Sequence, residues 1–305
     1  NKDQALLPGD CKVIRNWQGT ASGMWFERKG KVFVSMPGVP YEMKSMMEES
    51  VLPMVNHFFK VKPRVHKTVM TQGIGESSLS KIIEPWETKL RADGMALAYL
   101  PSPGIVKLRI TSYGDSQEEA TEEVYNRVQQ LKPLIEKYIF GYDGATLAEV
   151  IGRLLSERKA TLSTAESCTS GFLASRVTMV PGSSTYYMGS VVAYSYESKT
   201  TELGVNPDSL IKYGAVSEEV IEQMALGIRE KMGTDYAIAT SGIAGPGGGT
   251  PDKPVGTVWI AVSSRKGVFS KKFLFGNNRQ RNIERTAISA LSMLRKVLIG
   301  REDWI

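Results

Sequence analysis

The hydrophobic pattern of residues 1–59 predicts a β-hairpin followed by a helix. Apolar and polar residues alternate in MWFERKGKVFVSM on both sides of a turn at Lys29-Gly30. The following PGVP opens the helix, because Pro40 suits a first helical turn. The inward face of this helix is predicted to carry Met46, Met47, Val51 and Leu52. These elements are too few for a domain with its own core, so we interpret the block as the second half of one.

Residues 60–140 show a β-α-β-β-α order, which is typical of a small α+β module. VHKTVMTQ, MALAYLP and IVKLRITSY predict strands. A helix is predicted from Ser78 to Arg91, and its inward residues are Leu79, Ile82 and Ile83. A second helix is predicted from Ser116, with an interruption near Pro133 because proline cannot donate a helical hydrogen bond.

Residues 141–305 alternate between helical and strand patterns. Thr146 and Glu149 form a T-x-x-E capping box, and a helical stripe follows at Leu147, Val150, Ile151, Leu154 and Leu155. Strands are predicted at ATLSTA, GSVVAYS and YAIATS, and a hairpin at TVWIAVSS and VFSKKFLF. Ser217 is predicted to cap a further helix, and a last helix starts near Gln280. We therefore predict an α/β fold, with a mixed, mostly parallel sheet covered by helices on both faces and preceded by the α+β module and the partial α/β domain.

The amino-acid composition limits the kinds of functional site and partner that we expect. Of 305 residues, 42% are hydrophobic and 23% are charged, as in an ordinary globular protein without a membrane span. A net charge of +6 over this length does not by itself indicate nucleic-acid binding. Two cysteines make no disulfide framework, which favours a reducing cytoplasm. Only His57 and His66 are present, so we expect neither a zinc site nor a histidine-based triad in the C-terminal half.

Polar or glycine-rich segments follow three of the predicted C-terminal strands, namely ESCTSG, AYSYESK and TSGIAGPGGGTPDKPVG. Ligands bind beyond the carboxyl ends of strands in α/β sheets, so parallel strands would bring these segments together. Ser167 lies between a strand and a helix, where main-chain N–H groups and the helix dipole would stabilise an alkoxide or an oxyanion. The alternative is that Ser167 or Thr169 only caps this helix.

A serine nucleophile needs a base, and the scarcity of histidine points to Lys199. Burial and neighbouring groups can lower the pKa of a lysine enough for it to accept a proton. Tyr194, at the end of the second strand, could pass a proton on or orient the amine. In the alternative interpretation, Lys199 is a surface lysine and Tyr194 is a half-buried strand residue.

The glycine-rich segment 242–256 could bind phosphate or carboxylate through its main-chain N–H groups, although a wide turn without a ligand has the same composition. It is not a Walker loop, because no Gly-Lys-Ser/Thr closes it. GNNRQR then offers Arg279 or Arg281 to a phosphate, unless these arginines are solvated or form ion pairs.

The C-terminal block resembles the C-terminal domain of the CinA family, named for competence and damage inducibility. The resemblance rests, in order and spacing, on TAESCTSG, VVAYSYESK, GAVSEEV, TSGIAGPGGGTPDKPVGTV and FGNNRQRN. Two departures are mild. Ser170 stands where the family usually has glycine, and Asn277-Asn278 stands where Gly-Asp is common.

The resemblance implies a nicotinamide-nucleotide amidase, which converts nicotinamide mononucleotide to nicotinate mononucleotide and ammonia in pyridine nucleotide recycling. Ser167 would be the nucleophile, Lys199 and Tyr194 the proton-transfer pair, and Ser241 a supporting hydroxyl. Main-chain amides at the helix start would hold the oxyanion, and neither a metal nor a cofactor is expected. The substrate-binding residues would be Glu166, Thr169, Gly171, Gly242, Gly245, Gly247, Gly248 and Arg279.

The N-terminal blocks resemble other parts of the same family. NWQGTASGMW and MPGVPYEMKSMM are similar to the second half of its molybdopterin-binding-like domain, with Ser22 in place of the usual proline. TQGIGES and LPSPGIVKLRI are similar to its KH-like module, but GIGES lacks the basic G-x-x-G of an RNA-binding KH loop, so no nucleic-acid partner is expected.

The alternatives to an amidase are an ADP-ribose pyrophosphatase and a catalytically silent nucleotide-binding protein. The family's first domain cleaves ADP-ribose, and the sequence, which starts at Asn1, lacks the first half of that domain. We therefore expect the pyrophosphatase to be lost or incomplete. The expected partners are a small nucleotide substrate and a second copy in a homodimer, in the cytoplasm and without a membrane.

Overall fold

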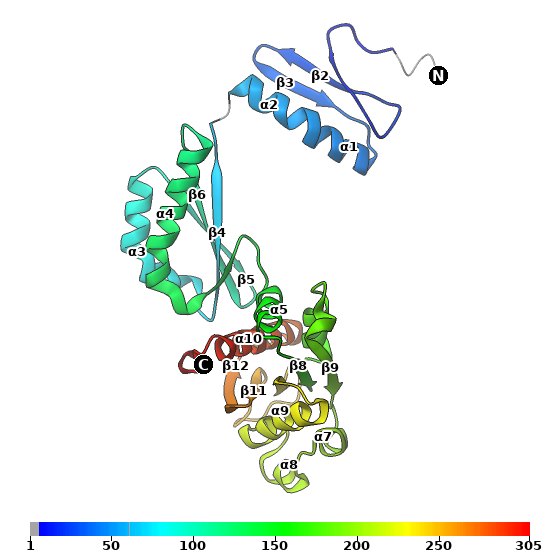
Figure 1. Ribbon diagram of the computed structural model, residues 1–305, viewed down its shortest axis with the longest axis vertical. Coiled ribbons are helices and arrows are strands. Elements are labelled where there is room, and N and C mark those ends of the chain that lie inside the picture. The colour runs from blue at the N-terminus through cyan, green and yellow to red at the C-terminus, as the bar shows by residue number, and fades with distance from the viewer. Residues whose placement is uncertain (1–5, 61) are drawn as a thin grey trace. The chain divides into compact units, whose positions relative to one another are not determined.

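The computed structural model describes residues 6–60 and 62–305, and the chain divides into two compact units. The first unit comprises Asn1–Pro63 and Gly114–Ser116. The second comprises Arg64–Tyr113 and Gln117–Ile305. Figure 1 labels most of the elements of both units.

The first unit contains a three-stranded antiparallel sheet of β1 (Lys12–Ile14), β2 (Gly23–Arg28) and β3 (Lys31–Ser35). The predicted hairpin is confirmed, and both turn residues, Lys29 and Gly30, have positive φ, as a two-residue turn requires. One helical stretch follows, made of α1 (Pro40–Met46), the π-helical η2 (Met47–Val51) and α2 (Leu52–Phe59). A small buried cluster joins sheet and helix through Ile14, Trp25, Met46 and Val51.

The predicted inward face of this helix is wrong at Leu52. Met46 and Val51 are buried, but Leu52 is 49% exposed. The cause is the π-helical turn, in which the Leu52 N–H donates to the carbonyl of Met47, five residues earlier. This wider turn shifts the phase of the residues that follow it, so Leu52 leaves the inward face.

In the second unit, residues 64–142 form a four-stranded antiparallel sheet in the order β5-β6-β4-β7. Its elements are β4 (Val65–Gln72), α3 (Glu76–Ala92), β5 (Ala96–Ser102), β6 (Ile105–Ser112), α4 (Gln117–Ile135), the 3₁₀ turn η3 (Glu136–Tyr138) and β7 (Ile139–Tyr142). Both helices pack on one face of the sheet (Figure 1). The predicted β-α-β-β-α order is confirmed, and β7 adds an edge strand that was not predicted and that crosses the expected boundary at residue 140.

Two details of this module differ from the prediction. Ile82 is 41% exposed, because the buried stripe of α3 runs through Leu79, Ile83, Trp86 and Leu90 and leaves Ile82 at its side. The helix α4 is not interrupted at Pro133 but continues to Ile135. Pro133 and Gln129, whose carbonyl loses its helical partner, are both exposed, so water can satisfy that carbonyl.

The C-terminal part of the second unit is built on a five-stranded sheet in the order β12-β11-β10-β8-β9. The strands are β8 (Leu162–Glu166), β9 (Tyr187–Val192), β10 (Tyr236–Gly242), β11 (Thr257–Ser264) and β12 (Gly267–Leu274). β8 pairs in parallel with β9 and β10, whereas β11 is antiparallel to β10 and β12. Four of the five strands therefore point the same way, and the predicted mixed, mostly parallel sheet is confirmed.

Helices cover both faces of this sheet, as predicted (Figure 1). One face carries α5 (Leu147–Arg158), α6 (Phe172–Thr178) and α10 (Arg279–Leu298), and the other carries α7 (Tyr196–Leu203), α8 (Pro207–Tyr213) and α9 (Glu218–Met232). The short turns are η4 (Ser183–Thr185) and η5 (Glu302–Trp304). The capping box of Thr146 and Glu149 is present. Ser217 stands at the start of α9, but its side chain accepts no capping hydrogen bond, and its hydroxyl donates to the Gly214 carbonyl.

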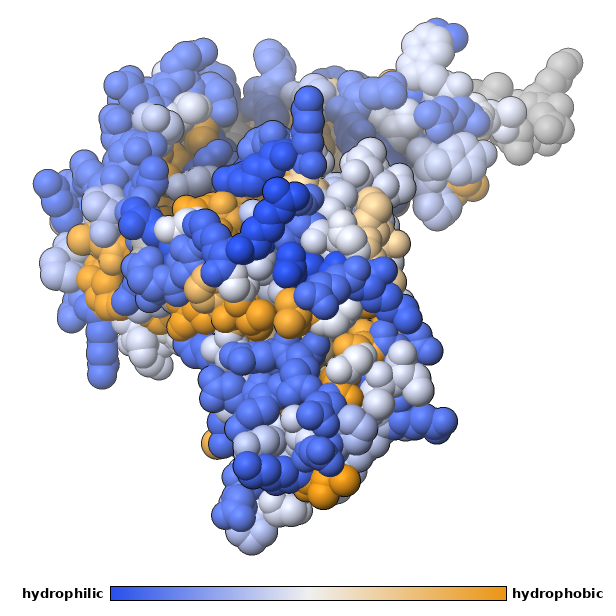
Figure 2. Space-filling view, turned by 60° about the horizontal axis from the view of Figure 1, so that its bottom comes forward, coloured by the Kyte–Doolittle hydropathy of each residue, from blue (hydrophilic) through white to orange (hydrophobic). Residues whose placement is uncertain are grey.

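Among the described residues, no helix has both the length and the apolar character needed to cross a membrane. The face drawn in Figure 2 is mostly hydrophilic, and its hydrophobic residues gather in separate smaller patches.

Candidate active site

The three polar segments meet at the carboxyl edge of β8, β9 and β10. Lys199 Nζ lies 3.2 Å from Ser167 Oγ, and Arg279 Nη1 lies 2.9 Å from the Gly245 carbonyl oxygen. Thr169 Oγ1 lies 2.7 Å from Thr240 Oγ1. Parallel pairing places the carboxyl ends of the three strands on one side, so residues distant in sequence come together there.

Lys199 is a buried residue, with 1% of its surface exposed, so its interpretation as a surface lysine is wrong. Its Nζ is 2.7 Å from the Ala193 carbonyl oxygen and 3.4 Å from that of Tyr194. Burial lowers the pKa of Lys199 because the charged form loses hydration. Burial therefore makes the Lys199 amine easier to deprotonate than an exposed one, and it lies within hydrogen-bond distance of a serine hydroxyl.

Glu166, rather than Ser167 or Thr169, caps α6. Its carboxylate is fully buried and accepts hydrogen bonds from the N–H groups of Gly171 (3.0 Å), Leu173 (3.1 Å) and Ala174 (2.8 Å). The interpretation of Ser167 or Thr169 as a mere cap is therefore wrong. These N–H groups are also occupied, so the prediction that the amides at the helix start hold an oxyanion is corrected. Glu166 is a positioning residue in this structure and does not face an open site.

The turn between Ser167 and α6 passes through two left-handed residues. Ser170 has a φ of +50° and Gly171 a φ of +90°. A side chain in this region costs about 1–2 kcal/mol, which explains why glycine suits position 170. The Ser170 N–H donates to the Ser167 carbonyl, and the Ser167 N–H donates to the Thr240 carbonyl. These bonds hold the main chain of Ser167 against the end of β10.

The side-chain hydroxyls of Tyr194 and Ser241 have partners other than Ser167 and Lys199. Tyr194 is 61% exposed, and its hydroxyl lies 3.5 Å from Arg279 Nη2. Ser241 Oγ donates to the Ala215 carbonyl at 2.7 Å, because alternate residues of β10 face opposite sides of the sheet. Within the described part of the chain, neither hydroxyl bonds to Ser167 or Lys199. The predicted proton-transfer roles of Tyr194 and Ser241 are therefore not met by this arrangement.

The glycines at the end of β10 and in the loop after it have different roles. A Cβ at Gly242 would lie 2.6 Å from Val258 Cγ2, and one at Gly245 would lie 2.6 Å from Val255 Cγ1, so close packing requires glycine at both positions. Gly247 has open space around it, and Gly248 has a φ of +85°. Gly247 and Gly248 help to line a hollow of about 580 Å³, so a ligand role for these two stays a prediction.

Asn282 is a positioning residue that sequence reasoning missed. It is buried in α10, and its Nδ2 donates to the carbonyls of Ala244 (2.9 Å) and Gly276 (2.7 Å). Its Oδ1 accepts from the Gly276 N–H. Asn282 thereby ties the glycine-rich loop to the segment before Arg279. The available signal was a polar residue on the buried stripe of an amphipathic helix.

Asn278 accounts for one departure from the family pattern. Its side chain accepts a hydrogen bond from the Arg281 N–H and caps α10, a role that aspartate would fill equally well. Cys168, next to Ser167, is 5% exposed, and burial raises the pKa of its thiol to about 12. Its thiol is therefore a poor nucleophile at neutral pH.

Comparison with known proteins identifies two regions of this chain. Residues 144–298 match the family described as the CinA C-terminal domain, and residues 66–141 match the damage-inducible protein CinA KH domain. A CinA-like protein of Cytophaga hutchinsonii is 46% identical over 98% of this chain and 71% of its own length. A putative competence-damage inducible protein of Caldanaerobacter subterraneus is 38% identical over 99% of this chain and 72% of its own.

Similar structures have also been solved. The match to the crystal structure of a competence/damage inducible protein from Agrobacterium tumefaciens covers 50% of this chain and 93% of that chain. The two are 37% identical, with a TM-score of 0.49. Residues before position 66 fall outside both matched domains, so their likeness to a molybdopterin-binding domain stays a prediction.

Proposed function

This chain belongs to the CinA family, and on that premise we propose that its C-terminal domain is a serine amidase acting on nicotinamide mononucleotide. The products are nicotinate mononucleotide and ammonia. The observation that carries the amidase chemistry is the 3.2 Å approach of Lys199 Nζ to Ser167 Oγ, with Lys199 buried. The choice of substrate rests on the family motifs around this pair.

In the proposed first step, neutral Lys199 takes the Ser167 proton while Ser167 Oγ bonds to the carboxamide carbon. The tetrahedral intermediate then collapses, the C–N bond breaks, and the Lys199 ammonium returns its proton to the leaving ammonia. In the second half, Lys199 takes a proton from water, and the resulting hydroxide attacks the acyl-enzyme. Ser167 leaves with a proton from Lys199, so one lysine serves both halves.

The oxyanion needs donors other than those bound to Glu166. We assign the main-chain N–H groups of Cys168 and Thr169 to this role. Both adjoin the nucleophile, and neither donates to a main-chain carbonyl among the described residues. Such donors are fixed before the reaction and gain strength from the low local polarity.

The nucleotide end of the substrate would lie toward Arg279. This guanidinium is exposed beside the Tyr194 hydroxyl and the glycine-rich loop, so it can pair with a phosphate. The exposed ring of Tyr194 then offers a face for the pyridine or ribose instead of a proton.

The test is ammonia release from nicotinamide mononucleotide by the whole chain. Ser167→Ala and Lys199→Ala should each lower kcat by at least about 10³-fold, since they act as a unit. Ser175→Ala and Lys212→Ala are matched controls, because each removes the same group from an exposed position. Undiminished activity in Ser167→Ala would refute the nucleophile. ADP-ribose, incubated in parallel, tests the alternative pyrophosphatase activity.

A further inference from the structure

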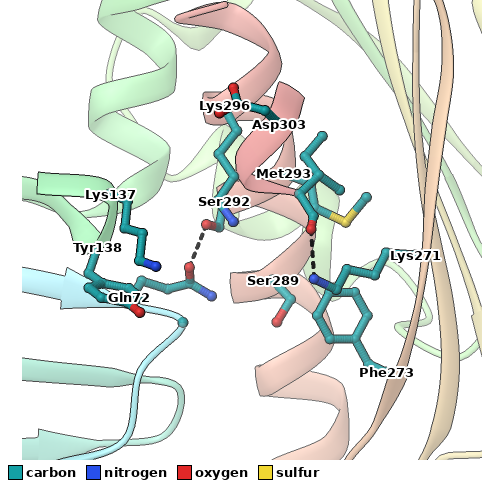
Figure 3. A pocket seen from close by; sticks show the side chains of 12 residues that line it. Gln72, Lys137, Tyr138, Lys271, Phe273, Ser289, Ser292, Met293, Lys296 and Asp303 are labelled. Atoms are coloured by element: carbon teal, nitrogen blue, oxygen red, sulfur yellow. Dashed lines mark hydrogen bonds between the residues drawn. The ribbon is translucent and has the colours of Figure 1, made fainter. Parts of the chain in front are cut away.

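A second polar cavity lies in the second unit, away from Ser167. It measures about 300 Å³ and is lined by residues of β12 and α10 on one side and by the end of β4 and η3 on the other (Figure 3). None of its lining residues belongs to the segment around Ser167, to α7 or to the glycine-rich loop. The mechanism proposed above makes no use of this cavity.

Three lysines from three different elements line it. Lys137 comes from η3, Lys271 from β12 and Lys296 from α10, and Figure 3 shows their side chains turned toward the same space. Asp303 is the one acidic side chain among the lining residues, so the lysines outnumber it. Lys271 Nζ is 2.7 Å from the Ile305 main-chain oxygen, which leaves its remaining protons available to a ligand.

Lys296 is half-buried, whereas Lys137 and Lys271 are exposed. Burial, and then the charges of Lys271, Arg295 and Lys137, lower the pKa of Lys296 to about 8. Arg295 is held by the Ile139 carbonyl, at 2.6 Å from Nη2. Placing like charges this close costs free energy that a bound anion would offset.

Neutral donors complete the lining. Ser289 and Ser292 are both buried, and Ser292 donates to the Gln72 side chain across the cavity wall (Figure 3). Hydroxyl, amide and ammonium groups around one space are the donor set that recognises phosphate oxygens.

We propose that this cavity binds a small phosphorylated ligand with at least two negative charges, through Lys137, Lys271, Lys296 and Ser289. The net positive lining favours a diphosphate over a monoanion. A volume of about 300 Å³ suits one or two phosphate groups with an adjoining fragment, whereas a nucleic-acid backbone needs a continuous basic groove. Because Lys137 belongs to the module of residues 64–142, the bound anion links this module to the C-terminal sheet and stabilises their junction.

Inorganic pyrophosphate is the probe, titrated calorimetrically into the whole chain carrying Ser167→Ala. We expect one site and a rise in the melting temperature with pyrophosphate concentration. Lys296→Gln and Lys271→Gln should each raise Kd by at least about tenfold. Lys272→Gln is the matched control, because the neighbouring position on β12 faces the other side of the strand, and its Kd should stay within about twofold of the parent.

A second measurement does not depend on variants. Pyrophosphate should slow the acetylation of Lys137, Lys271 and Lys296, read by mass spectrometry, but not that of Lys272. Equal Kd values for Lys296→Gln and Lys272→Gln, or no protection of the three lysines, would overturn the proposal. Loss of pyrophosphate binding in Arg279→Gln, with unchanged binding in Lys296→Gln, would show that pyrophosphate binds at the candidate active site instead. A single-stranded oligonucleotide that displaces pyrophosphate at a lower concentration would overturn the small-ligand class.

Discussion

The buried carboxylate of Glu166 makes a sharp test of how the nucleophile is positioned. Glu166→Gln keeps the size of the side chain, and the amide oxygen can still accept from Gly171 and Leu173. The amide nitrogen, however, faces the Ala174 N–H, which is 2.8 Å from Oε1. One charge-assisted hydrogen bond is thus replaced by two opposed donors, and the negative charge beside the helix start disappears.

The expected cost follows from these contacts. A hydrogen bond to a charged group contributes about 1.5–3 kcal/mol. The lost charge at the start of a helix contributes about 0.3–1 kcal/mol. We therefore expect Glu166→Gln to lower the free energy of opening of the α6 region by about 2–4 kcal/mol. Ser167 is the next residue, so kcat of the proposed amidase should fall as well.

Native-state hydrogen exchange on peptides from β8 and α6 measures this change locally. Glu197→Gln is the matched control, because it is the same change at an exposed position in the first turn of α7. Its cost in free energy should stay within about 0.5 kcal/mol. Equal exchange in the two variants would refute the assignment of Glu166 as the cap that holds Ser167.

Four further predictions follow from the same site. Ser170→Gly should stabilise the protein by about 0.5–2 kcal/mol and raise its melting temperature, because Ser170 has a φ of +50°. A lower melting temperature would show that the side-chain contacts of Ser170 outweigh the backbone strain. Asn282→Ala removes the three hydrogen bonds by which Asn282 holds the glycine-rich loop. It should lower the free energy of urea unfolding by about 2–4 kcal/mol and raise KM for the nucleotide. An unchanged KM would show that these hydrogen bonds do not affect substrate binding. Amidase activity should rise with pH and level off below the ordinary lysine value, because Lys199 must be neutral and its pKa is lowered by burial. The unfolded chain binds more protons at this lysine than the folded one, so its contribution to stability also rises with pH, and a falling rate between about pH 6 and pH 8 would contradict the role of Lys199 as base. Cys168→Ala should keep activity within about tenfold, since the pKa of the buried thiol is about 12, and a loss as large as that of Ser167→Ala would make the thiol essential.

Most of the secondary structure could be predicted because local rules govern it. The hairpin at Lys29-Gly30, the capping box at Thr146 and the alternating pattern of the C-terminal block each depend on residues close in sequence. Predictions failed where neighbours in space decided the outcome. Leu52 is exposed because a π-helical turn shifts its phase, and β7 forms because β4 has a free edge to pair with.

The candidate site divides in the same way. The residue types and strand ends pointed to Ser167 and Lys199, and the parallel pairing of β8 with its neighbours brings them to 3.2 Å. The orientations of Tyr194 and Ser241 could not be derived, since a hydroxyl turns toward whichever acceptor the fold offers. The Tyr194 hydroxyl accepts from Arg279, and the Ser241 hydroxyl donates to the Ala215 carbonyl.

The sequence by itself determined the class of fold, the family and the scarcity of histidine that directs attention to a lysine base. Only the tertiary structure decided that Glu166 caps the helix, that Lys199 is buried, and that three lysines share a separate cavity. The physical reason is that patterns along the chain record which residues avoid water. The pKa of a group and the partner of a hydrogen bond depend instead on atoms that folding brings from distant positions.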